Sequence, residues 1–100
     1  MPAKAPKIAQ AALTDLEEIG LYIARDNPTA ADKMINELYE HIHRLAAMPG
    51  MGHSREDLAP EPLRFWPVRH YLIIYRPDTK PIEIVRVLSG YRDLQTLLTS

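Results

Sequence analysis

The chain has 100 residues, of which 46% are hydrophobic and 25% are charged, with a formal net charge of -1 and no cysteine. This composition excludes wholesale disorder, a disulfide framework and a cysteine-based zinc site, and the length predicts a single domain over residues 1–100. No segment is apolar and long enough to span a bilayer, and we expect residues 1–7 to be neither a signal peptide nor an anchor. We therefore expect a cytoplasmic protein with no membrane attachment.

Charge is divided unevenly along the chain. Residues 1–62 carry six Lys/Arg and ten Asp/Glu, a net charge of -4, whereas residues 63–92 carry six Lys/Arg and two Asp/Glu, a net charge of +4. This asymmetry predicts a positive surface that attracts an anionic partner. The nearly neutral total argues against a dedicated nucleic-acid binder, because such proteins are usually basic overall.

A short strand is expected over residues 6–10, followed by a first helix. The helix is predicted to begin at Ala11, Ala12 or Thr14, because residues 14–17 read Thr-Asp-Leu-Glu and have the form of a capping box. It should end before Asn27, because the residue preceding a proline is pushed out of helical dihedrals. Its apolar stripe recurs at helical period, at Leu16, Ile19, Gly20 and Ile23.

The second helix is predicted to begin at once, with Asn27 as its N-cap and Pro28 at the first helical position. It should end at Met48, and residues 49–62 are expected to form a loop rich in proline and glycine. The two helices should pack as an antiparallel hairpin, because apolar residues recur at spacings of four and three along the second helix. These residues are Ala31, Ile35, Leu38, Ile42 and Leu45.

Three runs rich in β-branched and aromatic residues predict strands at 63–68, 71–76 and 82–88, joined by short turns into an antiparallel meander. Both faces of this sheet are largely apolar, so we expect the helical hairpin to cover one face and a partner to cover part of the other. Residues 92–98 are expected to form a short C-terminal helix or tail. Together these elements predict an α+β fold.

The sequence has none of the residue spacings that are usual for a metal site or a catalytic motif. His41 and His43 are two apart on a predicted helix and point in different directions, while His53 and His70 lie in predicted loops with no carboxylate at ligand spacing. There is no glycine-rich phosphate loop and no nucleophile signature. We therefore expect no metal and no cofactor.

The arginines of the predicted sheet, Arg64, Arg76, Arg86 and Arg92, allow two interpretations. They can solubilise the sheet edges and form ion pairs with Asp57, Glu83 and Asp93. Alternatively, they can form a surface for an anionic partner together with the aromatic side chains between them, because arginine and aromatic residues are common at interface hot spots. The aromatic residues are Trp66, Tyr71, Tyr75 and Tyr91.

Four motifs follow one another along the chain. They are Ala12-x-x-Asp15-Leu16-x-x-Ile19-x-x-Tyr22-Ile23-Ala24, the loop Pro49-x-Met51-Gly52-x-x-Arg55-x-Asp57-Leu58, the strand pair from Arg64 to Tyr75, and Arg86-Val87-Leu88-x-Gly90-x-Arg92-Asp93-Leu94. In this order they cover nearly the whole chain, and the sequence resembles a ParE-type toxin of the RelE/ParE superfamily.

The resemblance implies a fold with a short N-terminal strand, a helical hairpin and a three-stranded antiparallel meander. It also implies the toxin of a type II toxin-antitoxin system, held inactive in a hetero-oligomer by a ParD-like antitoxin. The C-terminal segment of such an antitoxin wraps the toxin and its N-terminal part binds DNA, so the toxin would meet DNA only through the antitoxin. ParE-like members poison DNA gyrase, and RelE-like members cleave mRNA on the ribosome.

RNA cleavage needs a base, an acid and cations around the phosphate. In an endoribonuclease these roles would fall to Arg64, Arg86 and Tyr91. Ser89, however, stands where many superfamily members have histidine, and a tyrosine with an ordinary pKa of about 10 is a poor base. We therefore favour a gyrase inhibitor with no catalytic residues. The alternatives are a ribosome-dependent endoribonuclease and a non-toxic antitoxin partner that acts as a co-repressor.

Residues expected to contact partners fall into two groups. Target contacts are predicted at Arg64, Trp66, Arg69, Tyr75, Arg86, Tyr91, Arg92 and Asp93. Antitoxin contacts are predicted at Tyr22, Ile23, Leu38, Tyr39, Tyr71 and Ile73.

Overall fold

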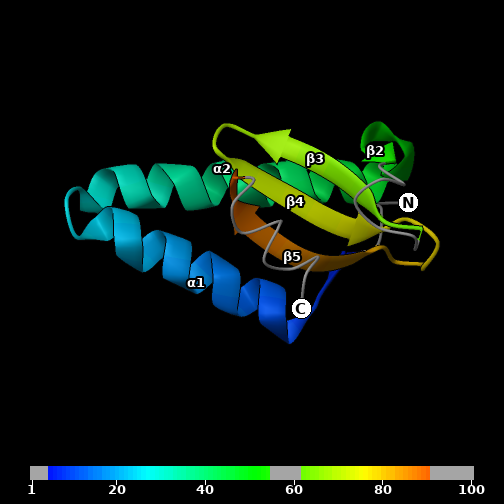
Figure 1. The fold of residues 1–100 in the computed structure, drawn as a ribbon, viewed down its shortest axis with the longest axis horizontal. Helices are drawn as coiled ribbons and strands as arrows, with labels where there is room; N and C mark the ends of the chain where they lie inside the picture. The colour runs from blue at the N-terminus through cyan, green and yellow to red at the C-terminus, as the bar shows by residue number, and fades with distance from the viewer. Residues whose placement is uncertain (1–4, 55–61, 91–100) are drawn as a thin grey trace.

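The computed structural model describes residues 5–54 and 62–90 (Figure 1). Its elements are β1 (Lys7–Ile8), α1 (Gln10–Ala24), α2 (Pro28–Ala47), the short 3-10 helix η1 (Pro49–Met51), β2 (His53–Ser54), β3 (Arg64–Val68), β4 (Tyr71–Arg76) and β5 (Glu83–Ser89). The predicted α+β fold is confirmed. The predicted C-terminal helix or tail at 92–98 lies outside the described residues.

The strands form one sheet in the order β1-β5-β4-β3-β2. β3, β4 and β5 pair antiparallel, as the predicted meander requires, and β1 adds to β5 in parallel. β2 corrects the prediction of an irregular loop over residues 49–62, because His53 and Ser54 pair antiparallel with Phe65 and Arg64. A strand of two residues is too short to show the alternation of apolar and polar residues that predicts a strand, so it is recognised only from its pairing with β3.

The two helices begin differently. At α2 the prediction is confirmed, because the Asn27 side chain accepts the Ala30 N–H at 3.1 Å and Pro28 opens the helix. At α1 the capping box is wrong, since the helix begins at Gln10 with no side-chain cap and residues 14–17 lie inside it. The carboxylate of Asp15 is not free to cap the helix, because it bonds to Arg86 and Val87 of β5.

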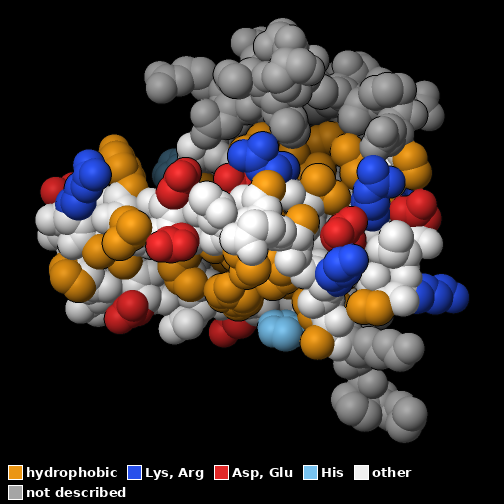
Figure 2. Space-filling model, turned by 90° about the horizontal axis from the view of Figure 1, so that it is seen from below, with side chains coloured by type: hydrophobic (Ala, Val, Ile, Leu, Met, Phe, Trp, Pro, Cys, Tyr) orange, Lys and Arg blue, Asp and Glu red, His pale blue; other side chains and the backbone are white. Residues whose placement is uncertain are grey.

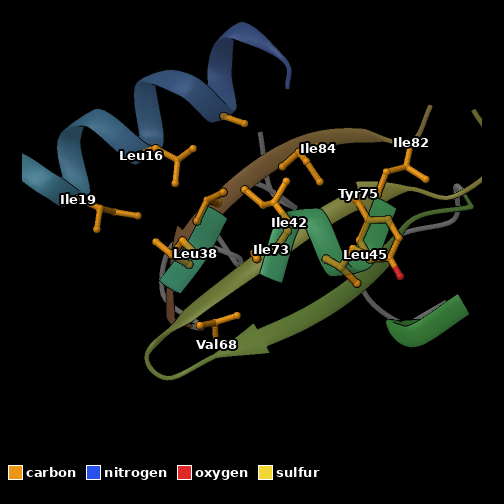
Figure 3. Close-up of a cluster of buried hydrophobic side chains, with 12 residues drawn as sticks. Leu16, Ile19, Leu38, Ile42, Leu45, Val68, Ile73, Tyr75, Ile82 and Ile84 are labelled. Carbon is orange, nitrogen blue, oxygen red and sulfur yellow. The ribbon is translucent and has the colours of Figure 1, made fainter. Parts of the chain in front are cut away.

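The core lies between the helical hairpin and one face of the sheet. α2 crosses behind the sheet and α1 runs beside β5 (Figure 1). Figure 3 shows apolar side chains of both helices and the sheet pointing into the space between them. The fully buried members are Leu38, Ile42, Leu45, Ile73, Tyr75 and Ile84.

The opposite face of the sheet carries a second apolar cluster around Phe65, Ile74 and Leu88, which confirms that both faces are apolar. Within the described residues, no helix has the length and apolar character needed to cross a bilayer.

Candidate protein-binding site

Three predicted target residues, Arg64, Trp66 and Arg69, lie on β3 or directly after it, beside α2. Glu37 and His41 of α2 face Arg69 and Trp66, and these two helical residues lie one above the other because they are four apart. Glu37 bonds to Arg69 and His41 bonds to Trp66. We call Trp66, Arg69, Glu37 and His41 the β3-α2 strip.

Trp66 is held in place from two sides. Its Nε1–H donates to Nδ1 of His41 at 3.0 Å, which fixes the indole against α2. The ring of His53 on β2 stacks on the indole, with ring centroids 6.3 Å apart and planes inclined by 21°. The side chain is half-buried, so a rigid aromatic surface remains accessible at this border of the sheet.

Arg69 occupies a turn of two residues between Val68, which ends β3, and Tyr71, which begins β4. Its φ angle is 55°, in the left-handed region that favours glycine. The Arg69 Nε donates to Oε2 of Glu37 at 2.8 Å, yet 65% of the Arg69 side chain is exposed. The hydrogen bond and the charge of Glu37 raise the pKa of Arg69 above its ordinary value, so this cation stays charged.

Arg64 and Tyr75 anchor the segment that precedes the meander. The Tyr75 hydroxyl accepts the Gly52 N–H at 2.8 Å and donates to the Pro49 carbonyl at 2.7 Å. Arg64 Nη1 donates to the Gly52 carbonyl at 2.8 Å. Tyr75 is fully buried by this arrangement, so its side chain is not accessible to a target in this structure.

The buried tyrosine also makes stability depend on alkaline pH. Burial raises the pKa of Tyr75, although the Gly52 N–H bond and the Arg64 charge partly oppose this shift. The folded state then holds the phenolic proton more tightly than the unfolded state does. The contribution of Tyr75 to the free energy of unfolding should therefore be fully present below about pH 10 and should be lost as pH rises through the folded pKa. Urea unfolding at increasing pH should show this loss. The slope of the free energy of unfolding against pH should be smaller for Tyr75→Phe than for the wild type. Equal slopes in both proteins would contradict this.

Arg86 is held at the other edge of the sheet. Its Nε and Nη2 donate to the two carboxylate oxygens of Asp15 at 2.8 and 2.9 Å, and the Val87 N–H donates to Asp15 Oδ2 at 3.0 Å. β1 pairs only with Glu83 and Ile84 of β5, and Asp15 accepts the N–H of Val87 farther along the same strand. A shift in register between β4 and β5 beside Ile74 and Tyr75 places Arg86 opposite Ile74 at this edge.

The predicted ion pairs of the arginines differ from those observed. Arg76 does lie beside Glu83, with Nε 4.0 Å from the carboxylate. Arg86 pairs with Asp15, a residue 71 positions away that the sequence did not suggest. The predicted partners Asp57 and Asp93 lie outside the described residues, as do the target candidates Tyr91, Arg92 and Asp93.

The predicted antitoxin residues divide by burial. Leu38 and Ile73 are fully buried in the core, so neither side chain is accessible to an antitoxin in this structure. Ile23, Tyr39 and Tyr71 are half-buried, and Tyr22 is 71% exposed.

Burial raises the pKa of Tyr71, and the neighbouring Tyr22 adds to this shift. Sequence reasoning missed Leu21, which is 62% exposed on α1 beside Tyr22. Figure 2 shows such hydrophobic side chains among charged ones over the helical hairpin.

Within residues 5–54 and 62–90, no group of three histidine or acidic side chains is placed to hold a metal ion. His41 and His53 both contact the ring of Trp66, and His41 also accepts the hydrogen bond from the Trp66 Nε1–H. The arrangement offers recognition surfaces rather than an assembled metal centre in this part of the chain.

Comparison with known proteins gives consistent matches. The model of the family described as the ParE toxin of the type II toxin-antitoxin system parDE matches residues 7–94. Toxin ParE3 of Caulobacter vibrioides is 31% identical over 85 residues, which cover 84% of each chain. A solved structure described as the chromosomal ParDE TA system from P. aeruginosa superposes with a TM-score of 0.73 at 22% identity, covering 90% of this chain and 99% of that one.

Proposed function

The chain belongs to the ParE toxin family of type II toxin-antitoxin systems, and we propose that it acts in the cytoplasm by inhibiting DNA gyrase through protein-protein contact. A cognate ParD-like antitoxin neutralises it in a hetero-oligomer. The observation that carries the choice of target is the position of the two arginines that an RNA-cleaving site would need.

Arg64 and Arg86 are held on β3 and β5, the two outer strands of the meander. Arg64 bonds to Gly52 beside β2, whereas Arg86 bonds to Asp15 beside β5. β4 lies between their strands, so the backbones of β3 and β5 are about 9–10 Å apart. Each guanidinium is bound to a different part of the chain, Arg64 to the Gly52 carbonyl and Arg86 to the Asp15 carboxylate. Neither guanidinium is held for joint binding of one phosphate in this conformation, because each already donates to its own acceptor, and this supports contact with a protein over RNA cleavage.

The exposed side chains of α1 support a binding surface for the antitoxin. Leu21 and Tyr22 are largely exposed, and Tyr22 lies near the half-buried Tyr71. Exposed leucine and tyrosine side chains on a helix suit a peptide that folds on binding and covers them. The antitoxin segment is therefore proposed to lie across α1 toward the start of β4.

Expression in cells tests this proposal. Without the antitoxin, the protein should arrest growth, and plasmid DNA recovered from the arrested cells should be relaxed because gyrase no longer supplies negative supercoils. Co-expression of the antitoxin should restore both growth and supercoiling.

Other outcomes of this experiment identify the alternatives. Growth arrest with normal supercoiling and cleaved mRNA would establish the endoribonuclease. Normal growth without the antitoxin would instead establish a non-toxic co-repressor.

A further inference from the structure

The turn between β3 and β4 holds an arginine where glycine or asparagine is the usual choice. Turns of two residues in hairpins favour glycine, asparagine or aspartate at positive φ, and Arg69 adopts a φ of 55°. An L-residue in this region costs about 1–2 kcal/mol. An exposed ion pair such as Arg69–Glu37 contributes about 0–1 kcal/mol, which does not outweigh that strain. The stability of the fold therefore does not account for arginine at this position.

The neighbours of Arg69 suit recognition of a protein. Trp66 and Arg69 bind residues of α2 that are one helical turn apart, since His41 accepts from Trp66 and Glu37 accepts from Arg69. The indole is fixed, so little side-chain entropy would be lost when a partner covers it. A rigid tryptophan beside an exposed guanidinium is the composition typical of an interface hot spot.

The edge of β3 favours side-chain contacts over the addition of a strand. β2 already pairs with Arg64 and Phe65, and Pro67 has no N–H to donate to a further strand. Described residues 62–90 contain five Lys/Arg and two Asp/Glu, a net charge of +3, which falls to +1 when the helical carboxylates of Glu37 and Asp15 that pair with Arg69 and Arg86 are included. A partner that docks here through its side chains should therefore carry acidic groups, which complement the positive charge of this surface.

We propose that Arg69, presented by the strained turn beside Trp66, binds a carboxylate on an acidic segment of the protein that the toxin inhibits. Glu37 holds the guanidinium in place in the free toxin and is exchanged for the carboxylate of the target on binding. This inference rests on the proposed function, because the target surface is taken to be that of gyrase.

Three variants test the inference. Arg69→Gly removes the guanidinium, and glycine accepts the positive φ, so the fold is retained. Glu37→Gln removes the internal competitor and keeps the shape of the side chain. Lys7→Ala removes one exposed positive charge from β1 at the opposite edge of the sheet and controls for net charge.

The measurements are inhibition of purified gyrase in a supercoiling assay and affinity for the purified antitoxin. Arg69→Gly should raise the inhibitory concentration by roughly tenfold or more, as for loss of a hot-spot side chain. Its inhibition should also depend less on salt than that of the wild type. Glu37→Gln should lower the inhibitory concentration, and Lys7→Ala should leave it unchanged. All three variants should bind the antitoxin as the wild type does.

Three results would overturn the inference and leave the proposed function in place. The first is inhibition by Arg69→Gly equal to that of the wild type. The second is an equal loss of inhibition in Arg69→Gly and Glu37→Gln, because the ion pair would then act structurally. The third is a loss of antitoxin affinity in Arg69→Gly with inhibition retained, which would assign the strip to the antitoxin. Absence of gyrase inhibition by the wild type would instead overturn the proposed function itself.

Discussion

Replacing Gly52 with alanine is expected to lower the free energy of unfolding by about 2–4 kcal/mol, from steric overlap and disrupted hydrogen bonds. A Cβ atom at Gly52 would overlap the Tyr75 hydroxyl and lie 2.7 Å from Cε1 and 2.9 Å from Cζ of the ring. That ring is fully buried and cannot move aside. The same change would disturb the bonds that Gly52 makes to Tyr75 and Arg64.

Gly50→Ala provides a matched control, because a Cβ atom there meets nothing within 4 Å. Urea unfolding should separate the two variants clearly, with Gly50→Ala within about 0.5 kcal/mol of the wild type. In a Tyr75→Phe background the cost of Gly52→Ala should shrink, since the hydroxyl is gone, but it should not vanish, since the ring carbons remain. Equal stability of the two alanine variants would refute the proposed anchoring role of Gly52.

Replacing Asp15 with alanine should lower the free energy of unfolding by about 2–4 kcal/mol, because it leaves a partly buried guanidinium and a backbone N–H without their acceptor. The side chains are 10% exposed for Asp15 and 31% for Arg86, so water compensates the arginine only in part. Asp15→Asn should fall between the wild type and Asp15→Ala, because its amide oxygen can still accept one hydrogen bond.

Glu17→Ala is the control for Asp15→Ala, since Glu17 is exposed on the same helix. Its effect should stay within about 0.5 kcal/mol. A double-mutant cycle between Asp15→Ala and Arg86→Ala should give a coupling energy of about 1 kcal/mol or more. Additive effects of the two substitutions would show that the pair does not tie α1 to β5.

Local signals in the sequence predicted most of the elements. Asn27 and Pro28 set the start of α2 through backbone chemistry that needs no tertiary contact. Alternation along β4 placed Tyr71, Ile73 and Tyr75 on a shared face, and all three do belong to the cluster beneath the helices. Alternation cannot tell which face the helices will cover, and this is why Tyr75 was expected to be accessible.

The errors arose where a distant partner decides the role of a residue. Residues 14–17 have the local form of a cap, but Asp15 bonds to Arg86 and Val87, more than 70 positions away in the sequence. The bond between Trp66 and His41 likewise joins residues 25 positions apart. The resemblance to a known family supplied the fold around these contacts, but no spacing rule within one sequence reveals such pairs.

Gyrase supercoiling in the presence of the purified protein tests the central claim most directly. One preparation should be added to gyrase with relaxed plasmid, and in parallel to a translation extract with intact mRNA, each with and without saturating antitoxin. We expect supercoiling to be inhibited, the antitoxin to relieve the inhibition, and the mRNA to stay intact. Unimpaired supercoiling together with cleaved mRNA would contradict a toxin that acts by protein contact. It would mean that Arg64 and Arg86 leave their bonds to Gly52 and Asp15 to act on RNA.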